Sequence, residues 1–240
     1  EENQDPNQSP NQDPKNQDPN QSPNPNQKAK ARHWIDCGPL GRGSFAQVSL
    51  GLDPHTSCLF AVKSAPLVPS RDELSALSNE RDILLSLSSP FVIPCLGSAS
   101  GPASLHLFLQ FMDSGSLTDL IHSSPAGKLP EARAASISRR VLLGLRYLHA
   151  NGIVHCDIKG RNILLDSTGA VKIADFGASR RIHGTSHQSD SSSSDSSSSD
   201  SSSSDSSSSS GCSFRGTPLW MAPEVVHGVQ GTASDIWSFG

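Results

Sequence analysis

The sequence has few of the features that mark nucleic-acid-binding proteins, cysteine-ligated metal sites or membrane-spanning proteins. Its 19 lysine and arginine residues form no stripe, so the basic footprint of a nucleic-acid-binding protein is missing. Its five cysteines are scattered without metal-ligand spacing, which favours reduced thiols inside a cell, in the cytoplasm or the nucleus. No segment resembles a signal peptide, and no apolar run is long enough to span a bilayer.

The formal net charge of −4 is concentrated in two segments. Residues 1–27 carry five acidic residues and one lysine, and a serine-rich tract at 189–210 carries four aspartates. The rest of the chain therefore has a net charge of about +4, so a mildly basic body carries two acidic appendages.

Both acidic segments are predicted to be disordered. Residues 3–27 repeat Asn-Gln-Asp/Ser-Pro, and a proline every fourth residue forbids a helix in this N-terminal tail, which we assign to residues 1–30. The tract at 189–210 contains only serine and aspartate up to Ser210 and has nothing to bury. The tail is read as a solvated spacer, with two Ser-Pro pairs as the alternative sites for proline-directed kinases.

The composition between these segments predicts a strand-rich part followed by a helix-rich part. Apolar runs bounded by turn residues predict strands near 34–40, 45–52, 59–64, 92–98 and 105–111. A helix is expected over 71–86, and the clearest helix runs over 130–151, where apolar residues recur at steps of three and four. Two lobes are therefore expected.

Several short segments carry residues suited to phosphate chemistry. "GRGSFAQV" at 41–48 places two glycines between strands, where backbone amides can approach phosphate oxygens, although a tight hairpin explains the same pattern. Lys63 closes an apolar strand and Glu80 lies on the following helix. The two are read either as an ion pair that fixes the ammonium beside a phosphate or as two exposed charges.

A second group of candidates lies in "HCDIKGRNILL" at 155–165 and in "DFG" at 175–177. Asn162 and Asp175 offer the hard oxygen ligands that Mg²⁺ needs in phosphoryl transfer. Asp157 is suited to accept the proton of the attacking hydroxyl or to orient that hydroxyl, and Lys159 supplies positive charge beside the moving phosphoryl group.

Together with "APE" at 222–224, these segments resemble the ordered motifs of eukaryotic protein kinases. The similarity covers residues 34–240. It implies an α+β, bilobal kinase fold, with a small antiparallel-sheet N-lobe plus one helix at 31–112. A mainly helical C-lobe would follow at 113–240, incomplete at its C-terminus and interrupted by the tract at 189–210.

The resemblance also implies the residues around ATP and Mg²⁺. The catalytic residues would be Asp157 and Lys159, the metal ligands Asn162 and Asp175, and the activation-segment residues Thr217 and Glu224, with Thr217 contacting Asp157 and Lys159. The ATP-binding residues would be Leu40, Gly41, Arg42, Gly43, Ser44, Phe45, Ala46, Val48, Ala61, Lys63, Glu80, Gln110, Met112 and Leu164.

Lys159 and "GTPLWMAPE" at 216–224 resemble serine/threonine kinases rather than tyrosine kinases. Together with "GRGSFAQVSLG" and "HCDIKGRNILL", they are most similar to plant MAP kinase kinase kinases of the MEKK type. The resemblance implies a protein substrate, a MAP kinase kinase, phosphorylated on serine or threonine. The alternative is a pseudokinase scaffold or a truncated fragment without activity. Pseudokinases typically lack one or more of five residues that are all present here: Lys63, Glu80, Asp157, Asn162 and Asp175.

Three departures from the kinase pattern affect regulation more than chemistry. Cys156 stands where many kinases carry the arginine that meets an activation-loop phosphate, and it is read as an inert, partly buried thiol rather than a redox sensor. Ala46 replaces the third glycine of the loop, and we expect the one added methyl group to be tolerated. The serine tract is either a slippage-prone loop extension or a phospho-acceptor region that docks on the basic body.

The sequence stops at Gly240 within "SDIWSFG", a segment that begins a buried helix in the kinase family. The resemblance implies several further helices and an arginine partner for Glu224. We therefore expect exposed apolar surface on residues 1–240, a natural product that is longer, and an unstable or inactive chain when residues 1–240 are made alone.

Overall fold

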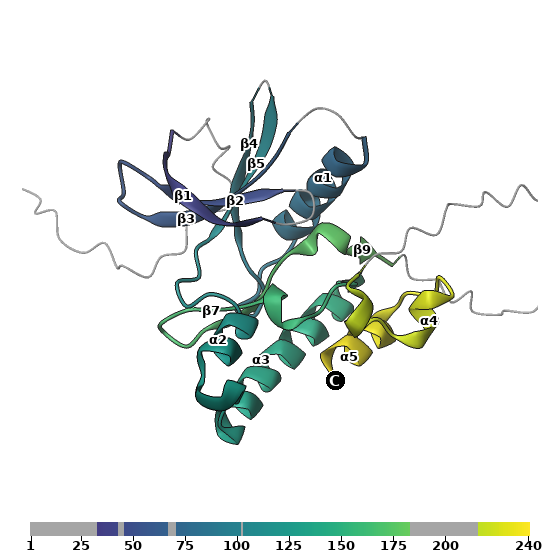
Figure 1. Ribbon diagram of the computed structural model, residues 1–240. Coiled ribbons are helices and arrows are strands. Elements are labelled where there is room, and N and C mark those ends of the chain that lie inside the picture. The colour runs from purple at the N-terminus through teal and green to yellow at the C-terminus, as the bar shows by residue number, and fades with distance from the viewer. Residues whose placement is uncertain (1–32, 43–45, 67–70, 102, 183–215) are drawn as a thin grey trace, which may run out of the picture.

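A computed structural model describes residues 33–42, 46–66, 71–101, 103–182 and 216–240 of the chain. Two lobes stack one above the other, with a sheet and one helix in the upper lobe and most helices in the lower (Figure 1). The predicted N-terminal tail, the serine tract and the loop residues Gly43, Ser44 and Phe45 lie outside the described residues.

The N-lobe is a five-stranded antiparallel sheet in the order β1-β2-β3-β5-β4. Its strands are β1 (Ile35–Arg42), β2 (Gln47–Leu52), β3 (Leu59–Pro66), β4 (Cys95–Ser100) and β5 (Ser104–Gln110), and α1 (Arg71–Leu85) follows β3. All five predicted strands and the predicted helix are present. The sheet and helix precede the larger lobe, as the kinase resemblance implied.

Strand alternation decides which side chains face the cleft. In β3, Phe60 and Val62 point to the outer face of the sheet, where Trp34 and Phe108 pack against them. Ala61, Lys63 and Ala65 therefore point to the opposite face, because successive side chains of a strand alternate. This face of the sheet is directed toward α1 and the C-lobe. The alternation of side chains along β3 therefore places Lys63 at the junction of the lobes.

The C-lobe is built around α3 (Glu131–Ala150), which buries its apolar stripe. The stripe consists of Ile137, Val141, Gly144, Leu145 and Leu148. Pro130 precedes the first turn and Gly152, with φ of +66°, follows the last. The helix thus ends close to its predicted limits because glycine tolerates the left-handed conformation there.

The remaining C-lobe elements are short. They are α2 (Leu117–Ser123), α4 (Pro223–Val226), α5 (Thr232–Phe239), the strand pair β7 (Ile163–Leu165) and β8 (Val171–Ile173), and the pair β6 (Ile153–Val154) and β9 (Arg180–Arg181). Four single-turn 3₁₀ helices complete them: η1 (Pro125–Gly127), η2 (Gly160–Asn162), η3 (Phe176–Ala178) and η4 (Pro218–Trp220). None of the described helices is both long and apolar enough to cross a bilayer.

One apolar core runs through both lobes. It joins Leu77, Ile83 and Leu84 of α1 to Leu145 and Leu148 of α3, among other buried residues. The segment before β4 contributes to this joint, since Ile93 N–H donates to Ile173 O and Ile173 N–H donates to Phe91 O, at 2.9 and 2.8 Å. The lobes are therefore fixed to each other beside the cleft.

Candidate active site

Three charged residues meet at the roof of the cleft. Lys63 Nζ lies 2.6 Å from Glu80 Oε2 and 2.7 Å from Asp175 Oδ1, so the predicted pair of Lys63 and Glu80 is an ion pair rather than two exposed charges. Burial by itself would lower the pKa of Lys63, but the carboxylates of Glu80 and Asp175 raise it above its ordinary value. The ammonium is thus held charged between the two carboxylates.

Asp175 occupies an unusual backbone conformation. Its φ of +64° lies in the left-handed region, which a non-glycine residue adopts only when its surroundings hold it there. The next residue, Phe176, is fully buried, and its ring lies edge-on to His155 with centroids 4.9 Å apart. Phe176 N–H also donates to Glu80 Oε1 at 3.3 Å. Burial of Phe176 therefore fixes Asp175 toward Lys63.

Burial disfavours the charged form of a carboxylate, so burial by itself raises the pKa of Asp175. The nearby ammonium of Lys63 outweighs that effect, and the pKa of Asp175 lies below its ordinary value. The Asp175 side chain is 46% exposed, although it binds Lys63. A charged carboxylate therefore faces the open cleft.

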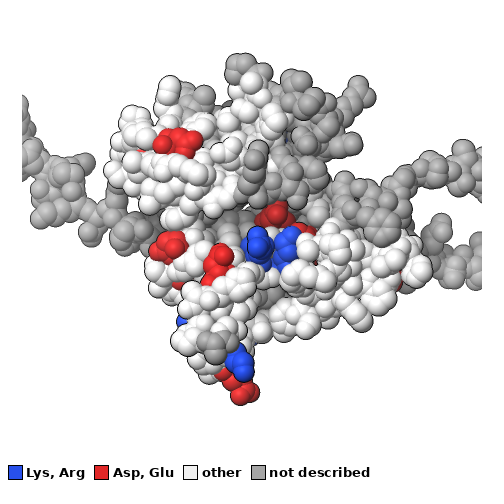
Figure 2. Space-filling view, viewed as in Figure 1, with Lys and Arg blue, Asp and Glu red and all other residues white. Residues whose placement is uncertain are grey.

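The catalytic-loop candidates converge below the cleft. Asp157 Oδ2 accepts hydrogen bonds from Lys159 Nζ at 2.7 Å and from Asn162 Nδ2 at 3.1 Å. Thr217 Oγ1 donates to Asp157 Oδ1 and accepts from Lys159 Nζ, both at 2.7 Å. The structure thus brings together the two predicted catalytic residues, one predicted metal ligand and the predicted activation-segment threonine. Figure 2 shows basic and acidic side chains meeting along the lower wall of the gap between the lobes.

A buried carboxylate that the sequence reasoning missed holds this loop in place. Asp235 of α5 accepts hydrogen bonds from His155 N–H and Cys156 N–H, both at 2.9 Å, and its Oδ2 lies 2.8 Å from His149 Nε2. Cys156 has a φ of +67°, and the two bonds to Asp235 hold its backbone there. The only sequence signal was an aspartate in the apolar segment "SDIWSFG".

The remaining residues predicted to bind ATP come from both lobes. Ala46 and Ala61 from the N-lobe and Leu164 from the C-lobe are partly buried and pack against the common core. Met112, in the segment between the lobes, is buried, whereas Leu40, on β1, is 45% exposed. Gln110 ends β5, Val48 pairs with Gly41 across the hairpin of β1 and β2, and Arg42 pairs with Gln47.

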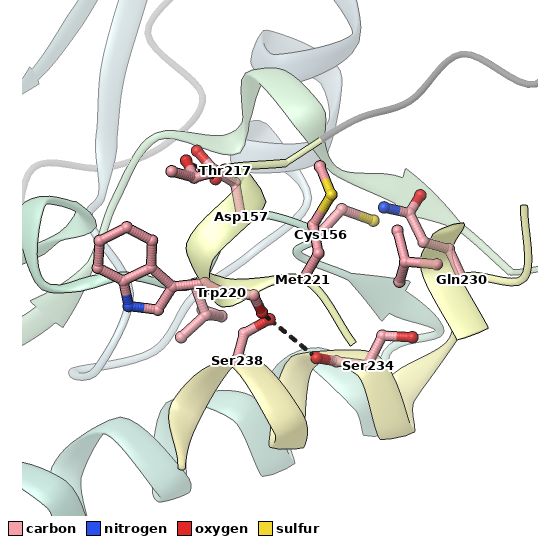
Figure 3. Close-up of a pocket in the computed structure, with 10 residues that line it drawn as sticks. Cys156, Asp157, Thr217, Trp220, Met221, Gln230, Ser234 and Ser238 are labelled. Atoms are coloured by element: carbon pink, nitrogen blue, oxygen red, sulfur yellow. Dashed lines mark hydrogen bonds between the residues drawn. The ribbon is translucent and has the colours of Figure 1, made fainter. Parts of the chain in front are cut away.

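A second hollow lies next to Asp157. Figure 3 shows Asp157 and Thr217 on one side of it, with Trp220, Met221, Gln230 and Ser238 around the rest. Cys156 also lines this hollow and is 9% exposed, so it is more buried than the partly buried thiol that the sequence predicted. Ser238 Oγ lies 2.7 Å from Trp220 O and 2.9 Å from Ser234 O, and its one proton can be donated to either carbonyl, so α5 supports the wall. The sequence alone did not single out Trp220, Met221, Gln230 or Ser238 as lining residues.

The comparisons with known proteins agree with this geometry. The family model described as the protein kinase domain matches residues 34–240. The chain belongs to the protein kinase family. The N-lobe sheet with one helix and the C-lobe helices are consistent with the kinase fold that the sequence predicted.

Among similar proteins, this kinase-family chain is 32% identical to mitogen-activated protein kinase kinase kinase 3 of Arabidopsis thaliana, over 89% of the chain and 31% of the relative. It is 35% identical to mitogen-activated protein kinase kinase kinase A of Dictyostelium discoideum, over 84% and 20%. It is also 35% identical to MAP3K epsilon protein kinase 1 of Arabidopsis thaliana, over 84% and 13%. The resemblance to MAP kinase kinase kinases is confirmed, and the chain spans less than a third of each of these relatives.

Glu224 connects α4 to α5 among the described residues. Its Oε1 accepts a hydrogen bond from Ser234 Oγ at 3.2 Å.

Proposed function

We propose that this chain carries the catalytic machinery of an ATP-dependent serine/threonine protein kinase. The observation that carries the proposal is the arrangement around Asp157, whose two carboxylate oxygens accept bonds from Thr217 Oγ1, Lys159 Nζ and Asn162 Nδ2. This arrangement leaves acceptor capacity on the carboxylate for one more hydroxyl, because each ionised oxygen has two acceptor positions. A serine or threonine side chain of a substrate would supply that hydroxyl.

The residues present fit a magnesium nucleotide. Asn162 donates both of its side-chain bonds through Nδ2, to Asp157 O and Asp157 Oδ2, so its Oδ1 is the atom suited to a cation. Asp175 offers a half-exposed, charged carboxylate. Two such hard oxygens suit Mg²⁺, which shares its ligands with phosphates and water. When bound, Mg²⁺ neutralises charge that develops on the phosphates.

The chain's own residues would divide the reaction among them. Lys63, held by Glu80, binds phosphate oxygens of ATP, and Asp157 orients the substrate hydroxyl and accepts its proton. The hydroxyl oxygen forms a bond to the γ-phosphorus while the bond to the β-phosphate oxygen breaks, which yields ADP and a phosphoprotein. Lys159 lies 2.7 Å from both Asp157 and Thr217 and supplies positive charge where the phosphoryl group moves.

The relatives' names support a more specific role, as a MAP kinase kinase kinase whose substrate is a MAP kinase kinase. The hollow beside Asp157, walled by Trp220 and Met221, adjoins the position proposed for the substrate hydroxyl. An intracellular protein, cytoplasmic or nuclear, is supported by the four free thiols among the described residues.

A pseudokinase scaffold is the competing function. Lys63, Glu80, Asp157, Asn162 and Asp175 all occur at the cleft, which favours catalysis over a scaffold that has lost one of them.

Transfer of labelled phosphate from ATP to a generic protein substrate separates these two functions. Asp157→Asn is expected to abolish transfer while calorimetry still detects nucleotide binding. Asp175→Ala is expected to weaken the Mg²⁺-dependent part of that binding as well. A wild-type chain that binds the nucleotide and transfers no phosphate would favour the scaffold or the inactive fragment, and wild-type activity in Asp157→Asn would refute the proposed role of Asp157.

A further inference from the structure

A separate hollow lies on the C-lobe between α2, α3 and the hairpin of β7 and β8. Its volume is about 490 Å³, counting the space open to solvent. The floor is aliphatic, since Ile137, Leu165 and Val171 are at most 5% exposed and Leu120 lines one side. Phosphoryl transfer as proposed above uses none of these residues. The floor offers room for one aliphatic side chain from a partner.

Two arginines of α3 frame this floor. Arg133 and Arg140 line the hollow and lie seven positions apart, which is two helical turns, so both point to the same face of α3 as Ser136 and Ile137. The rise of the helix separates their backbones by about 10 Å. Arg140 Nη1 donates to Ser136 Oγ at 2.8 Å, which holds that side chain along the wall.

The charge of these arginines is not balanced by an acidic partner. Across the described ranges, neither Arg133 nor Arg140 forms an ion pair. One carboxylate, Asp166, also lines the hollow, but its Oδ1 accepts from Thr168 N–H, Thr168 Oγ1 and Ala170 N–H. Asp166 therefore serves the turn between β7 and β8 and lies beyond ion-pair distance of both guanidinium groups.

We propose that this hollow, the α3 docking site, binds an extended acidic segment of a partner protein. Two carboxylates of the segment would meet Arg133 and Arg140, and an aliphatic side chain between them would enter the floor. A polyproline II peptide rises about 3.1 Å per residue and repeats every third residue, so residues n and n+3 share a face about 9 Å apart. The partner motif is therefore acid-x-aliphatic-acid or acid-aliphatic-x-acid.

The chain's own acidic segments do not match this motif. Residues 1–27 and the tract at 189–210 contain no alanine, valine, leucine or isoleucine. They could satisfy the arginines but supply no aliphatic side chain for the floor. A partner protein therefore fits the site better than either segment of this chain.

Fluorescence anisotropy of a labelled 12-residue peptide with the core Asp-Pro-Leu-Asp tests this proposal. The chain should bind the peptide, and Arg133→Glu/Arg140→Glu should weaken binding by about tenfold or more, since opposite charges at the rim become like charges. The matched control is Arg139→Glu/Arg146→Glu. It changes the net charge equally on exposed residues of α3 that lie roughly 110–130° around the helix from the docking site.

Peptide variants keep the test decisive if the charge-reversal chain folds poorly. Replacing the peptide's leucine by asparagine, or both aspartates by asparagine, should each weaken binding to the unmodified chain, and Arg133→Gln/Arg140→Gln provides a milder protein variant. The proposal would be overturned if the two arginine double variants lost the same amount of peptide affinity, or if the peptide without aspartates bound as tightly as the original. It would also be overturned if the chain did not bind the peptide at low salt. Equally strong competition by a peptide that copies residues 3–14 would overturn it as well, because the occupant would then be the chain's own tail.

Discussion

Thr217 serves two partners with a single hydroxyl group. It donates to Asp157 Oδ1 and accepts from Lys159 Nζ, so it fixes the carboxylate and the ammonium relative to each other. Thr217→Val keeps the shape and removes both bonds, each of which is worth about 1.5–3 kcal/mol when one partner is charged. We expect the rate of phosphate transfer at saturating ATP to fall by roughly tenfold to a hundredfold.

Thr217→Ser is the matched control for this prediction, because it restores the hydroxyl and removes only a methyl group. The serine variant should keep most of the wild-type rate. Equal rates for the valine variant and the wild type would show that the hydroxyl does not position Asp157.

His155 makes the stability of the fold depend on pH. Burial lowers its pKa below the ordinary value near 6.5, although Asp235 and other carboxylates oppose that shift. The folded chain therefore keeps His155 neutral, while the unfolded chain binds a proton as the pH falls below about 6.5. The free energy of unfolding should decrease as the pH falls, with a limiting slope of about 1.4 kcal/mol per pH unit from this residue.

Denaturant unfolding of wild type and His155→Phe at several pH values between about 8 and 5 measures this slope. Phenylalanine keeps an aromatic ring against Phe176 and removes the titrating nitrogens. The difference between the two unfolding free energies should shrink toward low pH, because only the wild type loses stability from protonation of this ring. A difference that is constant with pH would contradict the prediction.

At the scale of elements, α3 approaches β8 closely because residue 144 is glycine. A Cβ built on Gly144 would lie 2.7 Å from Ile173 Cδ1 and 3.2 Å from Phe91 O. Gly144→Ala gains about 1 kcal/mol of helix propensity but overpacks the core, which typically costs about 1–3 kcal/mol. We expect a net loss of about 1 kcal/mol in the free energy of unfolding.

Ile173→Val removes the Cδ1 atom that the new methyl group would meet. The double variant Gly144→Ala/Ile173→Val should therefore be more stable than the sum of the two single effects predicts, and urea unfolding of all four chains measures this coupling. Additive effects would show that the contact with Ile173 does not limit the packing of α3.

The elements also show what local sequence reveals about this fold. The apolar run at 59–64 and the three-to-four spacing in α3 predicted both elements to within a few residues, because these patterns are local. The strand expected at 92–98 instead begins at Cys95, since residues 91–93 hydrogen-bond to β8, which lies some 80 positions later. α2 was missed, although Ser116 and Asp119 form a capping box that the sequence displays.

The same limit applies to the candidate site. Ordered motifs pointed to Lys63, Glu80, Asp157, Lys159, Asn162 and Asp175, and these residues form the contacts at the cleft. The wall around Trp220 and the buried Asp235 depend on how α5 packs onto the catalytic loop. No local pattern reports that packing, so only the three-dimensional structure reveals these residues.

At the scale of the whole molecule, an apolar surface is exposed on the part of the C-lobe formed by η4, α4 and α5. The exposed residues are Leu219, Trp220, Val226, Val229, Ile236 and Trp237, of which Leu219 is 89% and Trp237 is 58% exposed. Exposed surface of this kind favours association and binds apolar dyes. The apolar surface predicted from the sequence is therefore present.

The 240-residue chain is expected to bind 1-anilinonaphthalene-8-sulfonate and to self-associate in size-exclusion chromatography. Ile236→Gln/Trp237→Gln should reduce both signals with little change in the melting temperature, because these residues are 48% and 58% exposed. A monomeric wild-type chain without dye binding would contradict this expectation, and a matched change at exposed Leu85, on α1, controls for a general loss of hydrophobicity.

The late position of Asp235 in the sequence affects the order in which the parts of a nascent chain can fold. The backbone of His155 and Cys156 is held by a carboxylate that is translated 80 and 79 positions later. A ribosome-bound intermediate that ends before α5 lacks the acceptor for these two amides. We therefore expect the N-lobe to become resistant to protease during synthesis before the segment around Asp157 does.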